Sequence, residues 1–228
     1  MNKFLKSFDK IISLGSNCYV KMFLESHLKK EETYFFDYIG SSMWSINELL
    51  KNDFQGLYDY KNFEKKHILN KGDKYIFTNI LYYIRFKHDF KQNFNSNIND
   101  IKEDLKFSEF VKKYKRRQKR FMEILNNSKE TILFIRYEED NKDRVKYYEE
   151  KDELEFIYEF MKILKTINPN KKFFFILLSH EKSLEDKDNN LLVVKIKDPI
   201  KIWTEAPNKI RNTLLENEKK NEFNILVS

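Results

Sequence analysis

Apolar residues along this chain follow two spacings, one typical of strands and the other of helices. Four short runs are apolar or nearly so, and they cover residues 11–14, 132–135, 173–178 and 191–196. Uninterrupted apolar runs of this length are typical of strands buried on both faces of a parallel sheet. We therefore expect these four segments to be neighbouring strands of one mainly parallel sheet.

Helical spacing appears in the segments between and after these runs. Apolar residues recur every three or four positions over residues 107–125, 154–164 and 207–219, which predicts three amphipathic helices. Asp152 followed by Glu155 matches the capping box that begins a helix. The alternation of strand and helix predicts an α/β fold, with a mainly parallel, Rossmann-like sheet and helices on both of its faces.

The stretch between the first and second apolar runs is less regular. Residues 34–39 are aromatic and predict an extended segment, whereas residues 75–86 predict one long strand or a pair of strands. The Asn- and Asp-rich residues 91–104 predict a loop. Because no repeat or interdomain linker is visible, we expect a single α/β domain over residues 1–228, in which residues 34–104 are an irregular insertion or cap.

Composition excludes several classes of protein. The 228 residues include 16% aromatic residues but only four glycines and three prolines, so the chain is neither disordered nor collagen-like. A single cysteine excludes an intramolecular disulfide. There is no paired-cysteine or H-E-x-x-H spacing and no glycine-rich phosphate loop, so we expect neither a metal nor a cofactor.

The net charge of +7 comes with a dense basic run at residues 112–120. Tyr114 and Phe121 occur at helical spacing in and after this run, so we interpret its Lys and Arg residues as the outer face of a packed helix. We therefore do not expect nucleic acid as a partner; an anionic substrate that meets Arg117 or Arg120 fits better. The substrate and the oligomeric state are not indicated.

The start of the chain lacks the pattern of a secretion signal. Lys3, Lys6 and Lys10 interrupt its apolar residues, whereas a signal peptide needs about 7–15 continuous apolar residues. The longest apolar runs are also far shorter than the ~20 residues that span a bilayer. We expect a cytoplasmic location.

Cys18 occupies a position with specific chemistry. It follows the first predicted strand and a Gly15-Ser16-Asn17 turn, and it precedes apolar residues at helical spacing. Unpaired N–H groups and the positive end of a helix dipole stabilise a thiolate there. Gly15 allows the tight turn, and Ser16 or Asn17 would cap the helix. Cys18 is either a reactive thiol or a small buried apolar residue.

Five motifs along the chain carry a resemblance to a known family. They read SLGSNC at 13–18, FFDYI at 35–39, FKHDF at 86–90, RRQKRF at 116–121 and LFIR at 133–136. In this order they resemble a bacterial and viral family of uncharacterised function that is catalogued as papain-like cysteine peptidases. The resemblance covers roughly the first 140 residues, with Phe35 and Tyr38 standing where the family prefers Pro and Trp.

The resemblance implies a thiol-dependent hydrolase or acyl transferase. Cys18 would be the nucleophile and His88 the base, with Asp89 or Asp37 as the acidic partner. Adjacent residues on a strand point to opposite faces, so Asp37 becomes the better partner if His88 lies on a strand.

A different interpretation starts from the predicted sheet, because ligands of Rossmann-like domains bind beyond the carboxyl ends of the strands. Ser16, Asn17, Arg136 and His180 would all lie there. Arg136 would hold an anion or form a structural salt bridge, and His180 competes with His88 as the base. We favour His88 because the motif match includes it. The alternative function is a glycan- or nucleotide-sugar-acting enzyme or a non-catalytic ligand-binding module.

Overall fold

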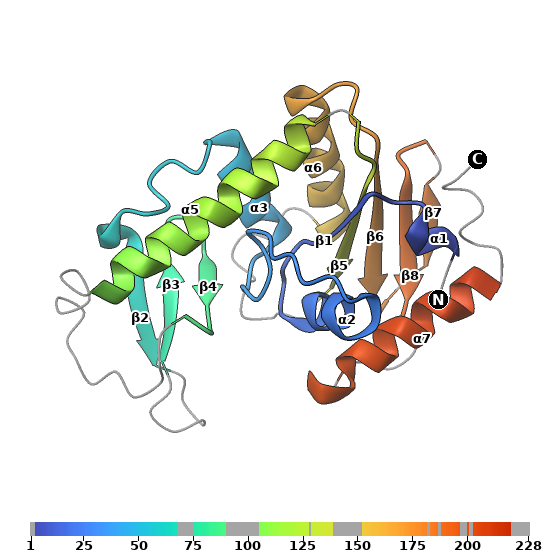
Figure 1. Cartoon of the computed structure of the whole chain (residues 1–228), viewed down its shortest axis with the longest axis horizontal. Helices are drawn as coiled ribbons and strands as arrows, with labels where there is room; N and C mark the ends of the chain where they lie inside the picture. Colours follow the sequence, from blue (N-terminus) through green and yellow to red (C-terminus); the bar gives the residue numbers. More distant parts are fainter. Residues whose placement is uncertain are drawn as a thin grey trace.

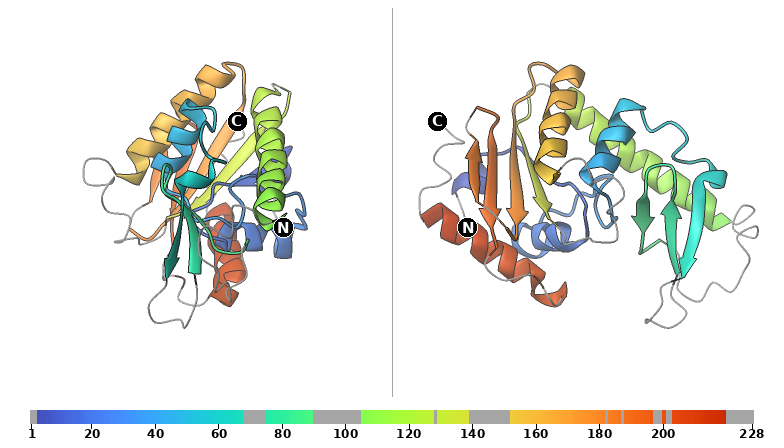
Figure 2. Two further views of the ribbon diagram at one scale, coloured as in Figure 1. Left: turned by 90° about the vertical axis from the view of Figure 1, so that its left-hand side faces the viewer. Right: turned by 180° about the vertical axis from the view of Figure 1, so that it is seen from behind.

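The structure is a computed structural model of the whole chain. It describes residues 3–67, 75–89, 105–127, 129–138, 152–181, 183–186, 188–196, 200 and 203–219. Within these ranges the molecule has a five-stranded sheet between two layers of helices and a separate three-stranded sheet to one side (Figures 1 and 2). The predicted α/β fold class is confirmed.

The five-stranded sheet contains all four of the predicted strands. They are β1 (Lys10–Ser13), β5 (Ile132–Tyr137), β6 (Phe173–Ser179) and β8 (Leu191–Lys195). They are parallel and adjacent in the order β1-β5-β6-β8, which confirms the predicted neighbours. The order follows the chain without the reversal found at the centre of a doubly wound sheet. A short antiparallel strand, β7 (Leu184–Asp186), completes the edge beyond β8.

Each face of this sheet has its own hydrophobic core, because neighbouring side chains on a strand point to opposite faces. On β5, Phe134 packs in the core that contains α3 (Met43–Lys51), α5 (Leu105–Asn126) and α6 (Glu153–Ile167). Its neighbours Leu133 and Ile135 pack in the opposite core. That second core contains α1 (Lys3–Lys6), α2 (Tyr19–Leu28) and α7 (Ala206–Lys219), which follows the short helix η3 (Trp203–Glu205). Helices therefore cover both faces, as predicted.

The predicted helix signals correspond to helix ends in the structure. Asp152 and Glu155 form the capping box of α6, with side-chain to backbone hydrogen bonds in both directions. On α5, Tyr114 and Phe121 are buried while Lys119 is exposed, so the basic run does form the outer face of a packed helix. In the described ranges no helix combines the length and the apolarity that crossing a membrane requires.

The irregular stretch contains a second sheet that the sequence only partly predicts. It has the antiparallel order β2-β3-β4, formed by β2 (Phe63–His67), β3 (Tyr75–Asn79) and β4 (Ile84–Phe86), with η1 (Tyr60–Asn62) before it. Of the two alternatives for residues 75–86, one long strand or a pair, the structure has the pair. β2 was not predicted, because its FEKKH sequence lacks a clear alternation of apolar residues. α5 runs from this sheet to the five-stranded sheet (Figure 1).

Residues 34–39 differ from the prediction. They form turns rather than an extended segment, and Tyr38 has a left-handed φ of 65°. Phe35 and Phe36 are fully buried in these turns and pack edge-to-face on each other and on α5. Aromatic burial, and not strand pairing, therefore accounts for the apolar character of this segment. The loop predicted at residues 91–104 lies outside the described residues, and the boundary of an insertion at 34–104 stays a prediction.

Candidate functional site

The turn between β1 and α2 is formed by two consecutive residues with left-handed backbone. Gly15 has a φ of 65° and Ser16 a φ of 68°. A Cβ atom on Gly15 would lie 2.3 Å from Ser41 Oγ, so only glycine fits between the turn and the segment that covers it. Ser16 is fully buried, and its φ is uncommon for a residue with a side chain. This tight reversal places Cys18 at the carboxyl end of β1.

Cys18 itself is the N-cap residue of α2, where the sequence predicted Ser16 or Asn17. Asn17 still acts next to it, because its Oδ1 accepts a hydrogen bond from the Tyr19 backbone N–H at 2.9 Å. Its Nδ2 is buried and has no hydrogen-bond partner among the described residues. The first turn of α2 contains no acidic residue, so nothing there opposes the positive end of the helix dipole. This position favours a negative charge on the half-buried thiol.

Tyr38 packs against His88 and lies within electrostatic range of Cys18. Its hydroxyl donates a hydrogen bond to Glu25 on α2. Burial, the Glu25 carboxylate, Asp37 and a negative charge on Cys18 together raise the pKa of Tyr38. On its other side, the ring packs edge-to-face against His88 with 5.9 Å between centroids. Tyr38 is thus in ring contact with His88, and the charge of Cys18 reaches its hydroxyl.

The His88 imidazole is exposed to solvent, although partial burial lowers its pKa. The charges of Lys87 and Lys113 act in the same direction, and that of Asp89 opposes them. His88 is therefore mostly neutral at pH 7, as a proton acceptor must be. Within the described part of the chain, no hydrogen bond joins this imidazole to a carboxylate.

Asp89 is held by α5. Its carboxylate forms an ion pair with Lys113 and accepts a hydrogen bond of 2.9 Å from the Tyr114 hydroxyl. Both bonds tie the segment after β4 to α5. Asp89 therefore positions the residue before it, His88, through the backbone.

Asp37 belongs to a fully buried ion pair that the sequence did not predict. Its Oδ2 lies 3.6 Å from Lys21 Nζ and accepts the Tyr34 backbone N–H at 2.8 Å. Burial raises the pKa of Asp37 to about 6, against the opposing effect of Lys21. Lys21 also donates to the carbonyl of Glu32 at 2.6 Å. The pair fastens the turns at residues 34–39 to α2, one helical turn after Cys18.

Lys21 could have been recognised by its position. It lies among the apolar residues of α2 and next to Val20, and it is only 1% exposed. A lysine on the apolar side of a short helix indicates a buried partner, because an unpaired buried charge is costly. Neither Tyr38 nor Glu25 carries a comparable sequence signal.

Arg136 joins three segments near the Cys18 turn. Its guanidinium donates to the carbonyl of Leu14 at 2.6 Å and to that of Ser41 at 3.0 Å, and it forms an ion pair with Glu153. The side chain is almost fully buried. Of the two roles considered for Arg136, the structure contains the salt bridge, which fixes the end of β1 against residue 41 and the start of α6.

His180 directly follows β6 and packs on an aromatic pair. Its ring packs edge-to-face on Tyr137, with 5.0 Å between centroids, and Tyr137 packs in the same way on Tyr19 at 5.3 Å. The Nδ1 atom is buried and has no hydrogen-bond partner among the described residues. Nearby, burial raises the pKa of Glu138, and the charge of His180 opposes this shift. One aromatic ring, that of Tyr137, thus lies between His180 and Tyr19, the residue after Cys18.

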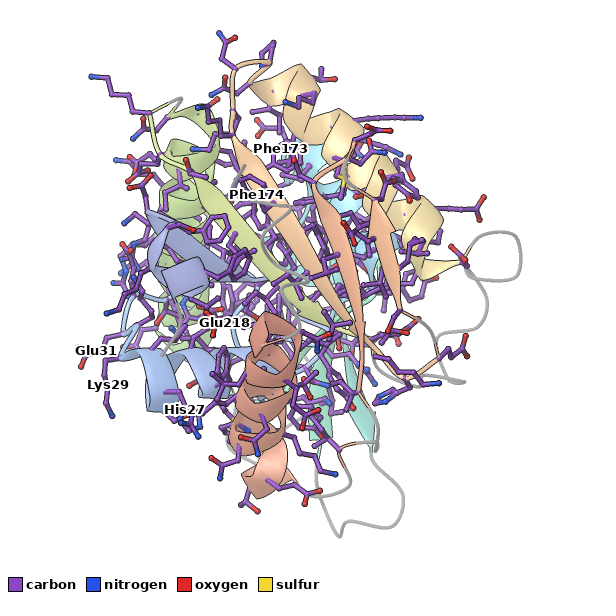
Figure 3. All side chains as sticks on the ribbon, turned by 90° about the vertical axis from the view of Figure 1, so that its right-hand side faces the viewer. His27, Lys29, Glu31, Phe173, Phe174 and Glu218 are labelled. Carbon is purple, nitrogen blue, oxygen red and sulfur yellow. The ribbon has the colours of Figure 1, made fainter. Side chains whose placement is uncertain are left out.

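Two further observations concern His27 and metal binding. His27 lies in the last turn of α2, at the opposite end from Cys18 (Figure 3). Among the residues that the structure describes, no group of three His, Cys, Asp or Glu side chains could hold a metal ion.

Comparison with known proteins gives one match. A family model described as "Putative papain-like cysteine peptidase" matches residues 9–183. Searches of curated proteins and of solved structures found no match. The matched range includes Cys18, His88, Arg136 and His180.

Proposed function

We propose, since the chain belongs to this family of papain-like cysteine peptidases, that it is a hydrolase or acyl transferase with Cys18 as nucleophile and His88 as base. One observation carries the proposal: the thiol occupies the N-cap of α2, and Tyr38, which packs on the His88 imidazole, lies within electrostatic range of it. The helix end favours the thiolate, and the lowered pKa of His88 keeps its imidazole able to accept a proton.

The reaction would proceed in two steps. Cys18 Sγ attacks a carbonyl carbon while its proton passes to His88, and the carbonyl oxygen becomes an oxyanion. When the tetrahedral intermediate collapses, the leaving group takes the proton from His88, and a thioester remains on Cys18. Water or another nucleophile then gives its proton to His88 and attacks the thioester, which releases the acyl group and restores the thiol.

The oxyanion would be held by donors around the thiol. Backbone N–H groups in the first turn of α2 point toward the cap position. The Nδ2 of Asn17 is a second source, because it is buried beside Cys18 and unpartnered among the described residues. Arg136 and the Lys21–Asp37 pair act as positioning residues, since their contacts fix the turn and the segment that carries Tyr38.

The proposal concerns the reaction and not the fold of papain. Papain-type enzymes place the histidine about 130–150 residues after the cysteine, whereas His88 follows Cys18 after only 70 positions. The parallel order of β1, β5, β6 and β8 also differs from an antiparallel barrel. A Cys–His pair can arise on unrelated folds, because catalysis depends on geometry rather than on connectivity.

The reactivity of Cys18 toward iodoacetamide across pH tests this function. The chain has one cysteine, so alkylation measured by the mass of the intact protein reports on Cys18 alone. Cys18→Ser is the negative control. We expect the alkylation rate to titrate well below the ordinary thiol value of about 8.5. A midpoint at the ordinary value, or an unreactive thiol, would overturn the proposal.

Acylation by p-nitrophenyl acetate provides the second measurement. We expect an acetyl thioester on Cys18 that hydrolyses in the wild-type protein and forms far more slowly in His88→Ala. Acylation at equal rates in the two proteins would remove His88 from the mechanism.

A further inference from the structure

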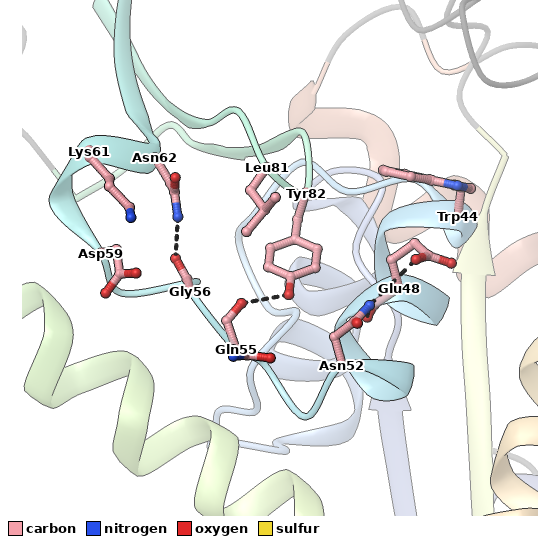
Figure 4. Close-up of a pocket in the computed structure, with 10 residues that line it drawn as sticks. All are labelled: Trp44, Glu48, Asn52, Gln55, Gly56, Asp59, Lys61, Asn62, Leu81 and Tyr82. Carbon is pink, nitrogen blue, oxygen red and sulfur yellow. Dashed lines mark hydrogen bonds between the residues drawn. The ribbon is translucent and has the colours of Figure 1, made fainter.

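A cavity of about 500 Å³ lies away from the Cys18 turn (Figure 4). It is bounded by α3, by the turns that follow α3 and by the β3–β4 hairpin, and its volume is in the range of small-molecule sites. None of its lining residues belongs to the turn at residues 15–18. The proposed reaction therefore does not account for it.

The walls of the cavity are fixed by internal hydrogen bonds. The Tyr82 hydroxyl donates to the carbonyl of Gln55 at 2.6 Å, and the Asn62 side chain donates to the carbonyl of Gly56 at 2.8 Å (Figure 4). Behind them, Asn79 donates to the carbonyl of Leu57 at 3.1 Å. The Tyr82 and Asn79 bonds join the turns after α3 to the β3–β4 hairpin, and the Asn62 bond joins them to η1, so the cavity keeps its shape without a ligand.

One end of the cavity is aromatic. Trp44 lines it and packs edge-to-face against Tyr83, with 6.0 Å between ring centroids. Tyr82 presents a second ring between Trp44 and the opposite wall (Figure 4). Flat apolar rings with polar surroundings suit a ligand that has both an apolar face and hydrogen-bonding edges.

The remaining lining is polar, and it includes two carboxylates and one ammonium group. Carboxylate and amide groups accept and donate hydrogen bonds in a plane. In this lining they come from Glu48, Asn52, Asp59 and Asn62. Glu48 is paired with Lys51 at 2.9 Å, and Lys61 lines the same cavity as Asp59. Lys51 lies outside the lining and also pairs with Glu159 at 2.6 Å, so the lining itself has two carboxylates and one ammonium group. A phosphate therefore meets no net positive charge here, and Lys61 and Lys51 offset much of the attraction for a polycation.

We propose that this cavity binds a neutral carbohydrate. A sugar ring has an apolar C–H face, which stacks on Trp44, and hydroxyl groups at its edge, which pair with planar amides and carboxylates such as Asn52 and Glu48. A nucleotide would require cationic or glycine-rich phosphate contacts, and an apolar peptide would cover the charged groups of Asp59 and Lys61 without pairing them. The site does not include Cys18. A negative result for carbohydrate binding would therefore leave the proposed thiol chemistry unaffected.

Calorimetric titration of the full chain tests the site. The probes are four neutral trisaccharides (maltotriose, cellotriose, xylotriose and chitotriose), with uridine diphosphate and spermidine as charged counterparts. We expect at least one trisaccharide to bind saturably and the two charged probes not to bind. Trp44→Ala should weaken that binding about tenfold or more, which is the scale of one aromatic contact.

Matched variants locate the binding. Asn52→Ala, at an exposed residue of the lining, should weaken binding, while Lys115→Ala on α5 and Cys18→Ser should leave it unchanged. A far-ultraviolet spectrum equal to that of the wild type shows that Trp44→Ala has folded. The proposal is overturned if no trisaccharide binds, if a charged probe binds instead, or if binding survives in both Trp44→Ala and Asn52→Ala.

Discussion

The two histidines considered as the base lie in opposite kinds of surroundings. His88 comes from a segment after β4, is exposed, and contacts Tyr38, whose hydroxyl is bonded to α2. His180 directly follows β6 of the parallel sheet, and its Nδ1 is buried beside Tyr137. The first histidine is thus supplied by the irregular part of the chain and the second by the sheet itself.

This difference shows how the proposed site depends on the rest of the fold. The sheet places His180 by strand geometry alone, since β5 and β6 are adjacent and parallel. The placement of His88 needs additional contacts, namely the Asp89 bonds to α5 and the Lys21–Asp37 pair beneath Tyr38. The position of the proposed base, His88, therefore depends on buried charged side chains.

The largest expected effect separates the two histidines directly. His88→Ala should slow acylation of Cys18 by about 10²–10⁴-fold, the usual contribution of a general base. His180→Ala should slow it by less than about tenfold. Because the pKa of His88 is lowered from 6.5 and the base acts when neutral, the wild-type rate should rise with pH through a midpoint below 6.5. A larger loss in His180→Ala would reverse the assignment of the base.

Removing the aromatic contact between α5 and the 34–39 turns should cost stability on the His88 side. Phe121 is fully buried and packs on Phe36, with 5.2 Å between ring centroids. We expect Phe121→Ala to lower the free energy of unfolding by about 3–5 kcal/mol, measured by urea titration. A loss below about 1 kcal/mol would mean that α5 does not anchor this side.

The buried charge on the same side should give a pH signature. Burial raises the pKa of Asp37 from 3.8 to about 6, so the folded state holds this proton more tightly than the unfolded chain. The stability that protonated Asp37 contributes is present below about pH 4 and is lost as the pH rises through about 6. Relative to Asp37→Asn, the wild type should therefore lose up to roughly 3 kcal/mol between these limits.

Urea titrations of the two proteins at pH 4, 5, 6 and 7 measure this difference. Asp188→Asn, at an exposed position, is the control and should track the wild type. If Asp37→Asn instead becomes less stable than the wild type as the pH rises, the attraction of Lys21 outweighs the cost of burying the carboxylate.

The smallest effect is expected on the outer face of α5. Lys119 and Glu123 form an exposed pair at 3.8 Å, and such pairs contribute about 0.5 kcal/mol or less. Lys119→Ala should therefore change neither the free energy of unfolding beyond that value nor the alkylation of Cys18. A loss of unfolding free energy comparable to that in Phe121→Ala would show that Lys119 is buried against other residues.

The regular part of the fold was predictable because its pattern is local. The runs at 132–135 and 173–178 are apolar on both faces, and they are central strands in the structure. The capping box at Asp152 has its signal within four residues. β7 was not predicted because its LED sequence is short and mostly exposed. It therefore contains no buried apolar side chain that would indicate a strand.

The candidate site was predictable only at its centre. Cys18 is recognisable from the strand, the Gly15 turn and the helix that follow one another directly in the chain. Tyr38 and His88, which the proposal groups with it, lie 20 and 70 residues later, and the spacing of apolar residues contains no information about which distant loops meet. The roles considered for Asp37 and Asp89 also depended on which charges they meet, Lys21 and Lys113.

By itself, the sequence determined the α/β class, the parallel strands and the thiol at the start of α2, because each depends on the identity of adjacent residues. Only the tertiary structure decided that residues 34–39 are turns, that Arg136 is bonded to Glu153, and that the irregular stretch forms a second sheet. Those features depend on burial and on partners far apart in the chain. A polar side chain in the interior must find a partner wherever the fold provides one, and which partner that is depends on the folded arrangement.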